Sequence, residues 1–159
     1  MAAVALRGTN RIGGKSAVSS PDEPWTLLRE AYHVFRRQRA GILQRLGLSL
    51  SEYAALRLCA RAPAMPSEIA EEAGVTSAGA TDIIDRLEER RLVRRLSHPK
   101  DRRAVLVALT PSGRRLYKEA QSAQREGFRT LGRTMTETEL EALLTGLAAL
   151  VRSVPSPPT

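Results

Sequence analysis

Apolar residues recur every three or four positions through most of this chain, which is the spacing that one buried face of an α-helix requires. The pattern predicts a first helix from near Pro24 to Gly47. A capping-box sequence, Ser49-Leu50-Ser51-Glu52, starts a second helix. A third helix is predicted from Pro66 to before Gly74, and a fourth follows Thr76, which is a suitable N-cap residue.

The periodicity changes between residues 92 and 109, where two short apolar runs favour β-strands. Residues 92–96 and 104–109 predict the two strands of a hairpin. Thr110 then caps a long helix, and Thr136 with Glu139 forms a capping box for the last helix. The predicted order is four helices, a hairpin and two helices, so we expect a mainly α fold with one small β-hairpin.

Residues 66–93, PSEIAEEAGVTSAGATDIIDRLEERRLV, have the pattern of a helix-turn-helix. Ala70 is small where the two helices would cross, Gly74 supplies the turn, and Ile83 holds the second helix against the first. In such a unit the second helix lies in the major groove of DNA and reads base edges mainly with its N-terminal half. The residues expected at the DNA are Thr76, Ser77, Ala78, Gly79, Thr81, Asp82 and Arg86.

The charge distribution supports a nucleic-acid interface beside this second helix. The chain has 25 Lys and Arg residues against 17 Asp and Glu residues, and its net charge is +8. Residues 86–103 are rich in arginine, whereas the charged residues of 136–159 are mainly acidic. A charge run is usually a solvated face, but a basic hairpin next to a helix-turn-helix is better explained by contact with phosphates.

The first helix and the last two helices carry longer apolar faces than the compact middle of the chain can cover. Exposed apolar faces of this length are usually buried against another chain, and two-fold pairing is the commonest arrangement. We therefore expect a homodimer. The alternative is that these helices pack on one another within a monomer.

The chain resembles the MarR family of bacterial winged-helix transcription regulators. The resemblance covers about residues 25–152 and includes Leu92-Val93-Arg94-Arg95 and the segment SHPKDRRAVLVALTPSG, residues 97–113. Its most specific part is Asp101-Arg102-Arg103-Ala104 followed by VALTPSG, residues 107–113. The resemblance implies that the hairpin is the wing and that Arg103 enters the minor groove, while Asp101 could hold the arginine in position or form a plain surface salt bridge. Lys100 and Arg102 are expected to neutralise phosphates.

The same resemblance implies a winged helix-turn-helix core between long dimerisation helices. The expected organisation is a flexible N-terminal tail (1–20), an N-terminal dimerisation helix (21–47), a winged helix-turn-helix DNA-binding region (48–110), C-terminal dimerisation helices (111–152) and a tail (153–159). For residues 1–20, an organelle-targeting peptide and an arm on DNA phosphates are alternatives.

Two positions depart from the family pattern. Asp82 stands where relatives often carry a base-contacting arginine; an aspartate can accept a hydrogen bond from cytosine N4 but repels phosphates, so an altered sequence preference is plausible. Arg91 stands where a helix-ending glycine is common, so it needs another way out of the helix or a left-handed conformation.

The resemblance also implies control by a small molecule, often a phenolic or other aromatic acid. The side chains expected near such a ligand are Trp25, Tyr32, His33, Tyr53 and Arg57. Each of these residues has an ordinary alternative role. Trp25, Tyr32 and Tyr53 could be core or dimer contacts, and His33 and Arg57 could be surface groups.

Other classes of chemistry find little support in the sequence. His33, His98 and the single Cys59 show no metal-ligand spacing, so we expect no metal or cofactor. Cys59 could sense oxidation, but its apolar neighbours favour a buried, inert thiol. No nucleophile–base pair or phosphate-binding glycine loop indicates an enzyme, and no apolar run approaches the roughly 20 residues of a membrane span.

The predicted function is that of a homodimeric, sequence-specific regulator of transcription that binds double-stranded DNA at a near-palindromic site. We expect a ligand-responsive repressor in the cytoplasm, with no membrane partner. The alternative is a winged-helix module that binds protein and has lost sequence-specific DNA binding. Asp82 is the best sequence argument for that alternative.

Overall fold

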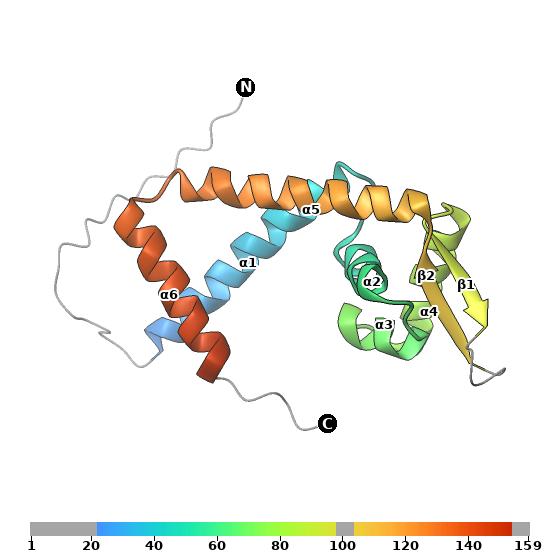
Figure 1. The fold of residues 1–159 in the computed structure, drawn as a ribbon. Helices are drawn as coiled ribbons and strands as arrows, with labels where there is room; N and C mark the ends of the chain where they lie inside the picture. The colour runs from blue at the N-terminus through green and yellow to red at the C-terminus, as the bar shows by residue number, and fades with distance from the viewer. Residues whose placement is uncertain (1–21, 98–103, 154–159) are drawn as a thin grey trace. The chain divides into compact units, whose positions relative to one another are not determined.

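The computed structural model describes residues 22–97 and 104–153 (Figure 1). It falls into two units, residues 1–34 and 35–159, and α1 passes from the first into the second. The elements, in chain order, are α1 (Glu23–Gln44), α2 (Leu50–Arg61), α3 (Pro66–Ala73), α4 (Ser77–Glu89), β1 (Val93–Ser97), β2 (Val105–Leu109), α5 (Pro111–Gly132) and α6 (Glu137–Ser153). The predicted mainly α fold with one hairpin is confirmed.

The described part of the first unit is the N-terminal half of α1, and its large apolar side chains are exposed. Trp25 is 74% exposed and Tyr32 is 59% exposed. The rings of Tyr32 and His33 meet edge to face, with their centroids 5.6 Å apart. This half of the helix therefore presents an apolar surface.

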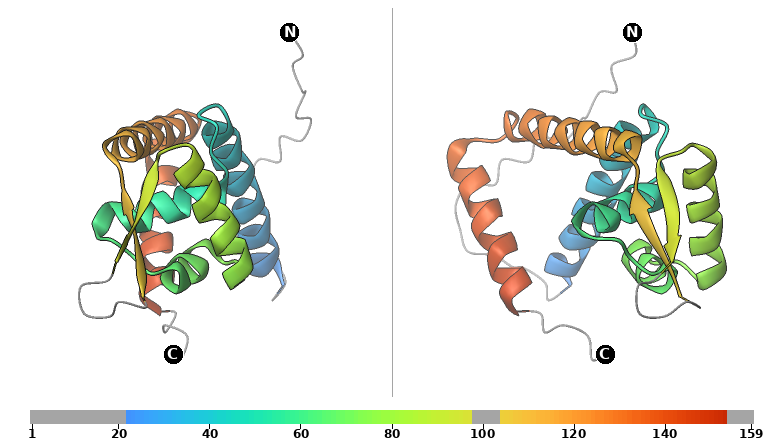
Figure 2. Two further views of the ribbon diagram at one scale, coloured as in Figure 1. Left: turned by 90° about the vertical axis from the view of Figure 1, so that its right-hand side faces the viewer. Right: turned by 45° about the vertical axis from the view of Figure 1, so that its right-hand side comes forward.

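The core of the second unit lies among α2, α3, α4, the hairpin and the N-terminal part of α5. Figure 2 shows α4 beside the hairpin, and α2 packs on α3, α4 and α5. The largest fully buried side chains are Leu43, Leu56, Ile69, Ile84, Leu87, Val93 and Val107. Because these side chains come from α1, α2, α3, α4 and both strands, apolar packing fixes α4 and the strands to one another.

Local capping bonds define the helix ends that the sequence predicts. The Ser49 N–H donates to Glu52 Oε2 at 2.7 Å and the Glu52 N–H donates to Ser49 Oγ at 3.1 Å, which is the predicted capping box. Thr76 Oγ1 accepts from the Gly79 N–H at 3.1 Å at the start of α4. Gly74, in the turn between α3 and α4, adopts the left-handed conformation with a φ of 63°.

The hairpin is antiparallel and is held to the helices at its base. Its register runs from Val93 opposite Leu109 to Ser97 opposite Val105. Ala64, in the connection between α2 and α3, exchanges two backbone hydrogen bonds with Val107, at 2.8 and 3.0 Å. The strand β2 therefore has a partner on each side near its buried end, which stiffens the base of the wing.

The chain leaves α4 through a residue that is not glycine. Arg91 has a φ of 54°, so it adopts the left-handed conformation, which is one of the two possibilities that the sequence left open. The Thr110 hydroxyl donates to the Arg91 carbonyl oxygen at 2.7 Å, and the same oxygen atom of Thr110 accepts from the Gly113 N–H at 3.0 Å. One threonine thus joins the end of α4 to the start of α5.

No residue of α6, all of which the structure describes, is buried. Its side chains Leu144, Leu147, Leu150 and Val151 are all exposed. These positions recur at helical spacing and form an uncovered apolar surface. Among the described residues, no helix has the length and apolar character needed to cross a membrane.

Candidate nucleic-acid interface and ligand cavity

The helix α4 buries one face and exposes the other. Ala80, Ile83, Ile84 and Leu87 are buried against the core. Of the seven residues predicted at the DNA, Thr76, Ser77, Ala78, Thr81, Asp82 and Arg86 are exposed. Gly79 is half-buried, because its Cα packs towards Val75. The N-terminal half of α4 is therefore an accessible surface with short side chains, which a groove can approach closely.

An ion cluster that sequence reasoning missed joins β1 to α4. Arg95 Nη2 lies 2.5 Å from Asp85 Oδ1, and Arg95 Nη1 pairs with Glu88. The backbone N–H of Arg95 also donates to Glu88 Oε1 at 3.2 Å. The hydrogen bond that Arg95 donates to Asp85 is the main cause that raises the pKa of Arg95 above its ordinary value. We call these three residues the Arg95 cluster. They hold β1, the first strand of the wing, against α4, which we call the reading helix.

A second contact that the sequence did not predict holds the C-terminal half of α4. Among the described residues, Glu52 is the one charged side chain that is buried. Its Oε2 caps α2, while its Oε1 lies 3.5 Å from Arg90 Nη1 and 3.8 Å from Arg86 Nε. A single carboxylate therefore orders the start of α2 and holds two arginines of the reading helix.

Other arginines beside α4 are available to phosphates. Arg91 and Arg94 are exposed and form no ion pair with any residue in the described ranges. They lie at the end of α4 and on β1, next to the Arg95 cluster. The predicted wing residues Lys100, Asp101, Arg102 and Arg103 lie outside the described residues. The described part of the hairpin provides the two strands that carry them.

A cavity of about 490 Å³ lies among α1, α2 and α5, within the second unit. Phe35 and Phe128 stack at its side with ring centroids 6.4 Å apart, and Tyr53 stacks on Tyr117 at 5.8 Å. Its lining residues are Phe35, Gln38, Arg39, Ile42, Tyr53, Gln121, Gln124, Arg125, Gly127, Phe128 and Arg129. None of these lining residues is acidic, so the cavity combines aromatic surface with positive charge.

Two polar groups of this cavity are strongly affected by burial. Arg39 Nε donates to Gln124 Oε1 at 2.8 Å, but the buried Nε2 of Gln124 has no hydrogen-bond partner in the described structure. Burial is the main cause that raises the pKa of Tyr53, whose hydroxyl is already protonated at neutral pH at its ordinary pKa. The site thus offers hydrogen-bond donors, which suit an acceptor or an anion.

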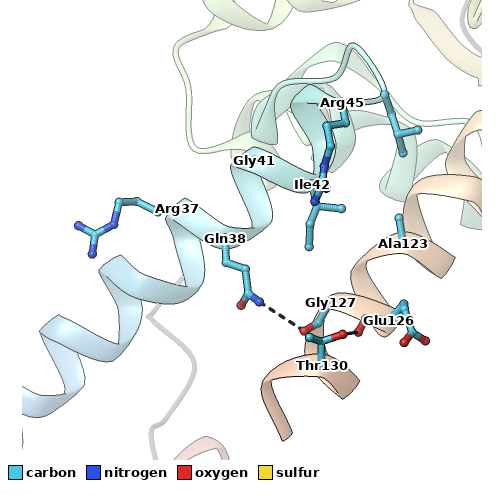
Figure 3. Close-up of a pocket in the computed structure, with 10 residues that line it drawn as sticks. Arg37, Gln38, Gly41, Ile42, Arg45, Ala123, Glu126, Gly127 and Thr130 are labelled. Atoms are coloured by element: carbon cyan, nitrogen blue, oxygen red, sulfur yellow. Dashed lines mark hydrogen bonds between the residues drawn. The ribbon is translucent and has the colours of Figure 1, made fainter. Parts of the chain in front are cut away.

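A second cavity, of about 790 Å³, lies along the crossing of α1 and α5 (Figure 3). Gln38 Nε2 donates to the Gly127 carbonyl oxygen at 3.3 Å across this crossing, as Figure 3 shows. A Cβ atom at Gly127 would lie 2.4 Å from Ile42 Cδ1, so the helices approach closely there. Gln38, Ile42 and Gly127 line both cavities.

The residues predicted near a ligand do not come together as one set. Tyr53 lines the cavity of 490 Å³. Arg57 does not line it and pairs with Glu72. Trp25, Tyr32 and His33 lie exposed in the first unit and are not among the lining residues. Sequence reasoning missed Phe35, Arg39, Gln124 and Phe128, although their helical spacing on α1 and α5 could have suggested one shared face.

Cys59 is buried, as predicted, and its surroundings make it unreactive. Burial raises the pKa of its thiol to about 11. The thiolate is the reactive form, so at neutral pH this side chain is a poor nucleophile and a poor metal ligand. Within residues 22–97 and 104–153, no group of three or more His, Cys, Asp and Glu side chains is placed to hold a metal ion.

Comparison with known sequences supports the interpretation of α3, α4 and the hairpin. A family model described as MarR family matches residues 46–104. The HTH-type transcriptional repressor Rv2887 of Mycobacterium tuberculosis is 32% identical over 100 residues, which are 62% of this chain and 72% of that protein. The homoprotocatechuate degradative operon repressor of Escherichia coli is 29% identical over 103 residues, 64% of this chain and 70% of the relative. The match to another relative, the uncharacterized HTH-type transcriptional regulator YsmB of Bacillus subtilis, spans 41% of its length.

Comparison with solved structures supports the fold. RV1404 from Mycobacterium tuberculosis superposes with a TM-score of 0.75 over 90% of this chain and 100% of its own, at 23% identity. BldR from Sulfolobus solfataricus, a transcriptional regulator, superposes with a TM-score of 0.68 over 86% of this chain and 100% of its own, at 27% identity. The likeness at 23% identity shows the fold, including the helices on either side of the helix-turn-helix.

Proposed function

Because this chain belongs to the MarR family of transcriptional regulators, we propose that it is a homodimeric repressor that binds a near-palindromic site in double-stranded DNA. The observation that carries this proposal is the exposed N-terminal half of α4, together with the free arginines Arg91 and Arg94, which follow the C-terminal end of the same helix. Short side chains let the helix enter a major groove, and the arginines can neutralise phosphates at its edge. The protein acts on DNA in the cytoplasm.

The proposed contacts divide between the two grooves. The major-groove contacts come from Thr76, Ser77, Ala78, Gly79, Thr81, Asp82 and Arg86 on α4. The minor-groove contacts are proposed for Lys100, Asp101, Arg102 and Arg103, which lie between β1 and β2 in the sequence and outside the described residues. Arg103 enters the minor groove, where a narrow groove concentrates negative potential, and its neighbours neutralise phosphates.

The homodimer is supported by apolar surface on the outer helices. Exposed leucines follow one another on α6, and Trp25 and Tyr32 are exposed on α1. Pairing of such surfaces between two copies removes them from water. A two-fold dimer would place its two reading helices in successive major grooves, roughly 34 Å apart.

The test is a salt titration on DNA recovered by selection from a random pool. If the dimer makes six or more phosphate contacts, the logarithm of the binding constant should fall with the logarithm of salt concentration with a slope of about −5 or steeper. The selected duplex should also bind more tightly than a scrambled duplex. A flat salt response, or equal binding of both duplexes, would favour the alternative of a protein-interaction module.

The proposal includes a small anionic aromatic effector in the cavity of 490 Å³. Phe35 and Phe128 provide flat apolar walls, while Arg39 and Arg125 provide positive charge. An aromatic ring with a carboxylate or phenolate satisfies both features. One relative is named for an operon that degrades homoprotocatechuate, which is an aromatic acid.

Benzoate and its hydroxylated derivatives are the probes for this effector site. At least one of them should weaken operator binding by about 5- to 150-fold, the range of a typical allosteric coupling. Arg125→Gln should reduce this effect, whereas Arg37→Gln, which removes an arginine of the other cavity, should leave it unchanged. Operator affinity that no probe alters, or equal effects of the two variants, would contradict the assignment of the cavity.

A further inference from the structure

Asp82 is a free carboxylate on the exposed face of the reading helix. It forms no hydrogen bond or ion pair with any described residue. The other acid nearby, Asp85, is held by Arg95, with 2.5 Å between Oδ1 and Nη2. The Thr81 hydroxyl donates to the Ser77 carbonyl oxygen at 3.1 Å, so its proton is used within the helix. The first two turns of α4 therefore present one unpaired charge, and it is negative.

A free carboxylate in this place needs a hydrogen-bond donor on the DNA, and few groups can supply one. Phosphates offer only negative oxygens. In the major groove, guanine presents the acceptors N7 and O6, and thymine presents the acceptor O4 and a methyl group. Adenine presents a donor at N6 but places the acceptor N7 beside it. Cytosine presents its N4 amino group with no neighbouring acceptor on its edge.

We propose that Asp82 is a specificity-determining residue that accepts a hydrogen bond from the N4 amino group of a cytosine in each half-site. This inference rests on the proposed function, since it assigns a base to one position of the interface. The small side chains of Ser77 and Ala78, one turn before Asp82, allow the close approach that a short aspartate needs.

Asp82 distinguishes between bases mainly by weakening binding to sequences that place no hydrogen-bond donor opposite its carboxylate. Opposite any base without a donor, the Asp82 carboxylate loses water and gains no partner, which is the costly outcome for a charged group. The phosphate contacts proposed for Arg91 and Arg94 offset the general repulsion between Asp82 and DNA. The aspartate therefore weakens binding to most sequences and spares those with cytosine at one position.

The experiment measures affinity for every single-base change in the selected half-site, with the wild-type protein and with Asp82→Ala. The wild-type protein should prefer cytosine at one position of each half-site by about 5- to 150-fold. Asp82→Ala should lose this preference at that position and keep the others, and it should bind scrambled DNA more tightly. Asp82→Asn should shift the preference towards adenine, because an amide can pair with both N6 and N7.

The matched control is Glu89→Gln, which removes one negative charge from the exposed side of the same helix two turns later. It should raise affinity for all duplexes alike and alter no base preference. If Asp82→Ala keeps every base preference, or changes affinity equally for all duplexes, Asp82 acts by charge alone and the inference is wrong while the proposed function stands. If the wild-type protein itself has no base preference, the proposed function fails, and the inference fails with it.

Discussion

Gly113→Ala is expected to lower the free energy of unfolding by about 3 kcal/mol or more, at the upper end of the cost of overpacking. An added Cβ atom would lie 1.9 Å from the carbonyl oxygen of Leu92 and 2.8 Å from its carbonyl carbon. Both are backbone atoms, so no side chain can turn aside to make room. The same carbonyl oxygen accepts a hydrogen bond from the Thr110 N–H at 3.0 Å, so a shift of Leu92 would also disturb the junction of the hairpin with α5.

The measurement is urea unfolding followed by circular dichroism at one fixed protein concentration, because dimer stability depends on concentration. Gly146→Ala is the control, since no atom lies within 4 Å of the added Cβ atom. It removes a glycine from the interior of α6 and should raise the free energy of unfolding by up to about 1 kcal/mol, the difference in helix propensity. Equal stabilities of the two variants would contradict the close approach of α5 to Leu92.

Features that depend on a few neighbouring residues could be predicted from the sequence. The capping boxes at Ser49 and Thr136 require two side chains three positions apart, and both form as expected. The N-cap at Thr76 is equally local. For Arg91 the sequence left two possibilities, a left-handed conformation or another way of ending the helix, and the structure shows the left-handed conformation. In these cases the hydrogen bonds and steric contacts lie within one helical turn, so the rest of the fold has little influence on whether they form.

Contacts between distant segments could not be predicted in the same way. The chain has 25 basic and 17 acidic residues, so the sequence allows many ion pairs for Arg95 or Glu52. Which pairs form depends on how β1 and α2 lie against α4. The cavity of 490 Å³ is likewise lined by residues from three helices, α1, α2 and α5, that are distant in the sequence, and Tyr53 is the one predicted ligand residue among them.

Arg95→Ala is expected to weaken operator binding about 100-fold, which corresponds to tenfold, or about 1.4 kcal/mol, for each subunit of a dimer. Without the Arg95 side chain the base of the wing keeps only its apolar packing and one backbone hydrogen bond to α4, and the carboxylate of Asp85 loses its ion pair. The same change should lower the free energy of unfolding by about 1 kcal/mol or less, because ion pairs exposed to solvent contribute little. Arg95 and Asp85 are 37% and 51% exposed.

Fluorescence titration with the operator measures the loss of affinity. Arg115→Ala is the control for the loss of one positive charge, because the Arg115 side chain on α5 donates a hydrogen bond to Ser112 within its own helix and forms no part of the Arg95 cluster. A double-mutant cycle with Arg103→Ala then separates positioning from charge. If the Arg95 cluster acts by placing the wing, Arg103→Ala should cost much less affinity in the Arg95→Ala background than in the wild-type protein. Additive losses would mean that Arg95 contributes its charge independently of the wing, and this result would refute its role as a positioning residue.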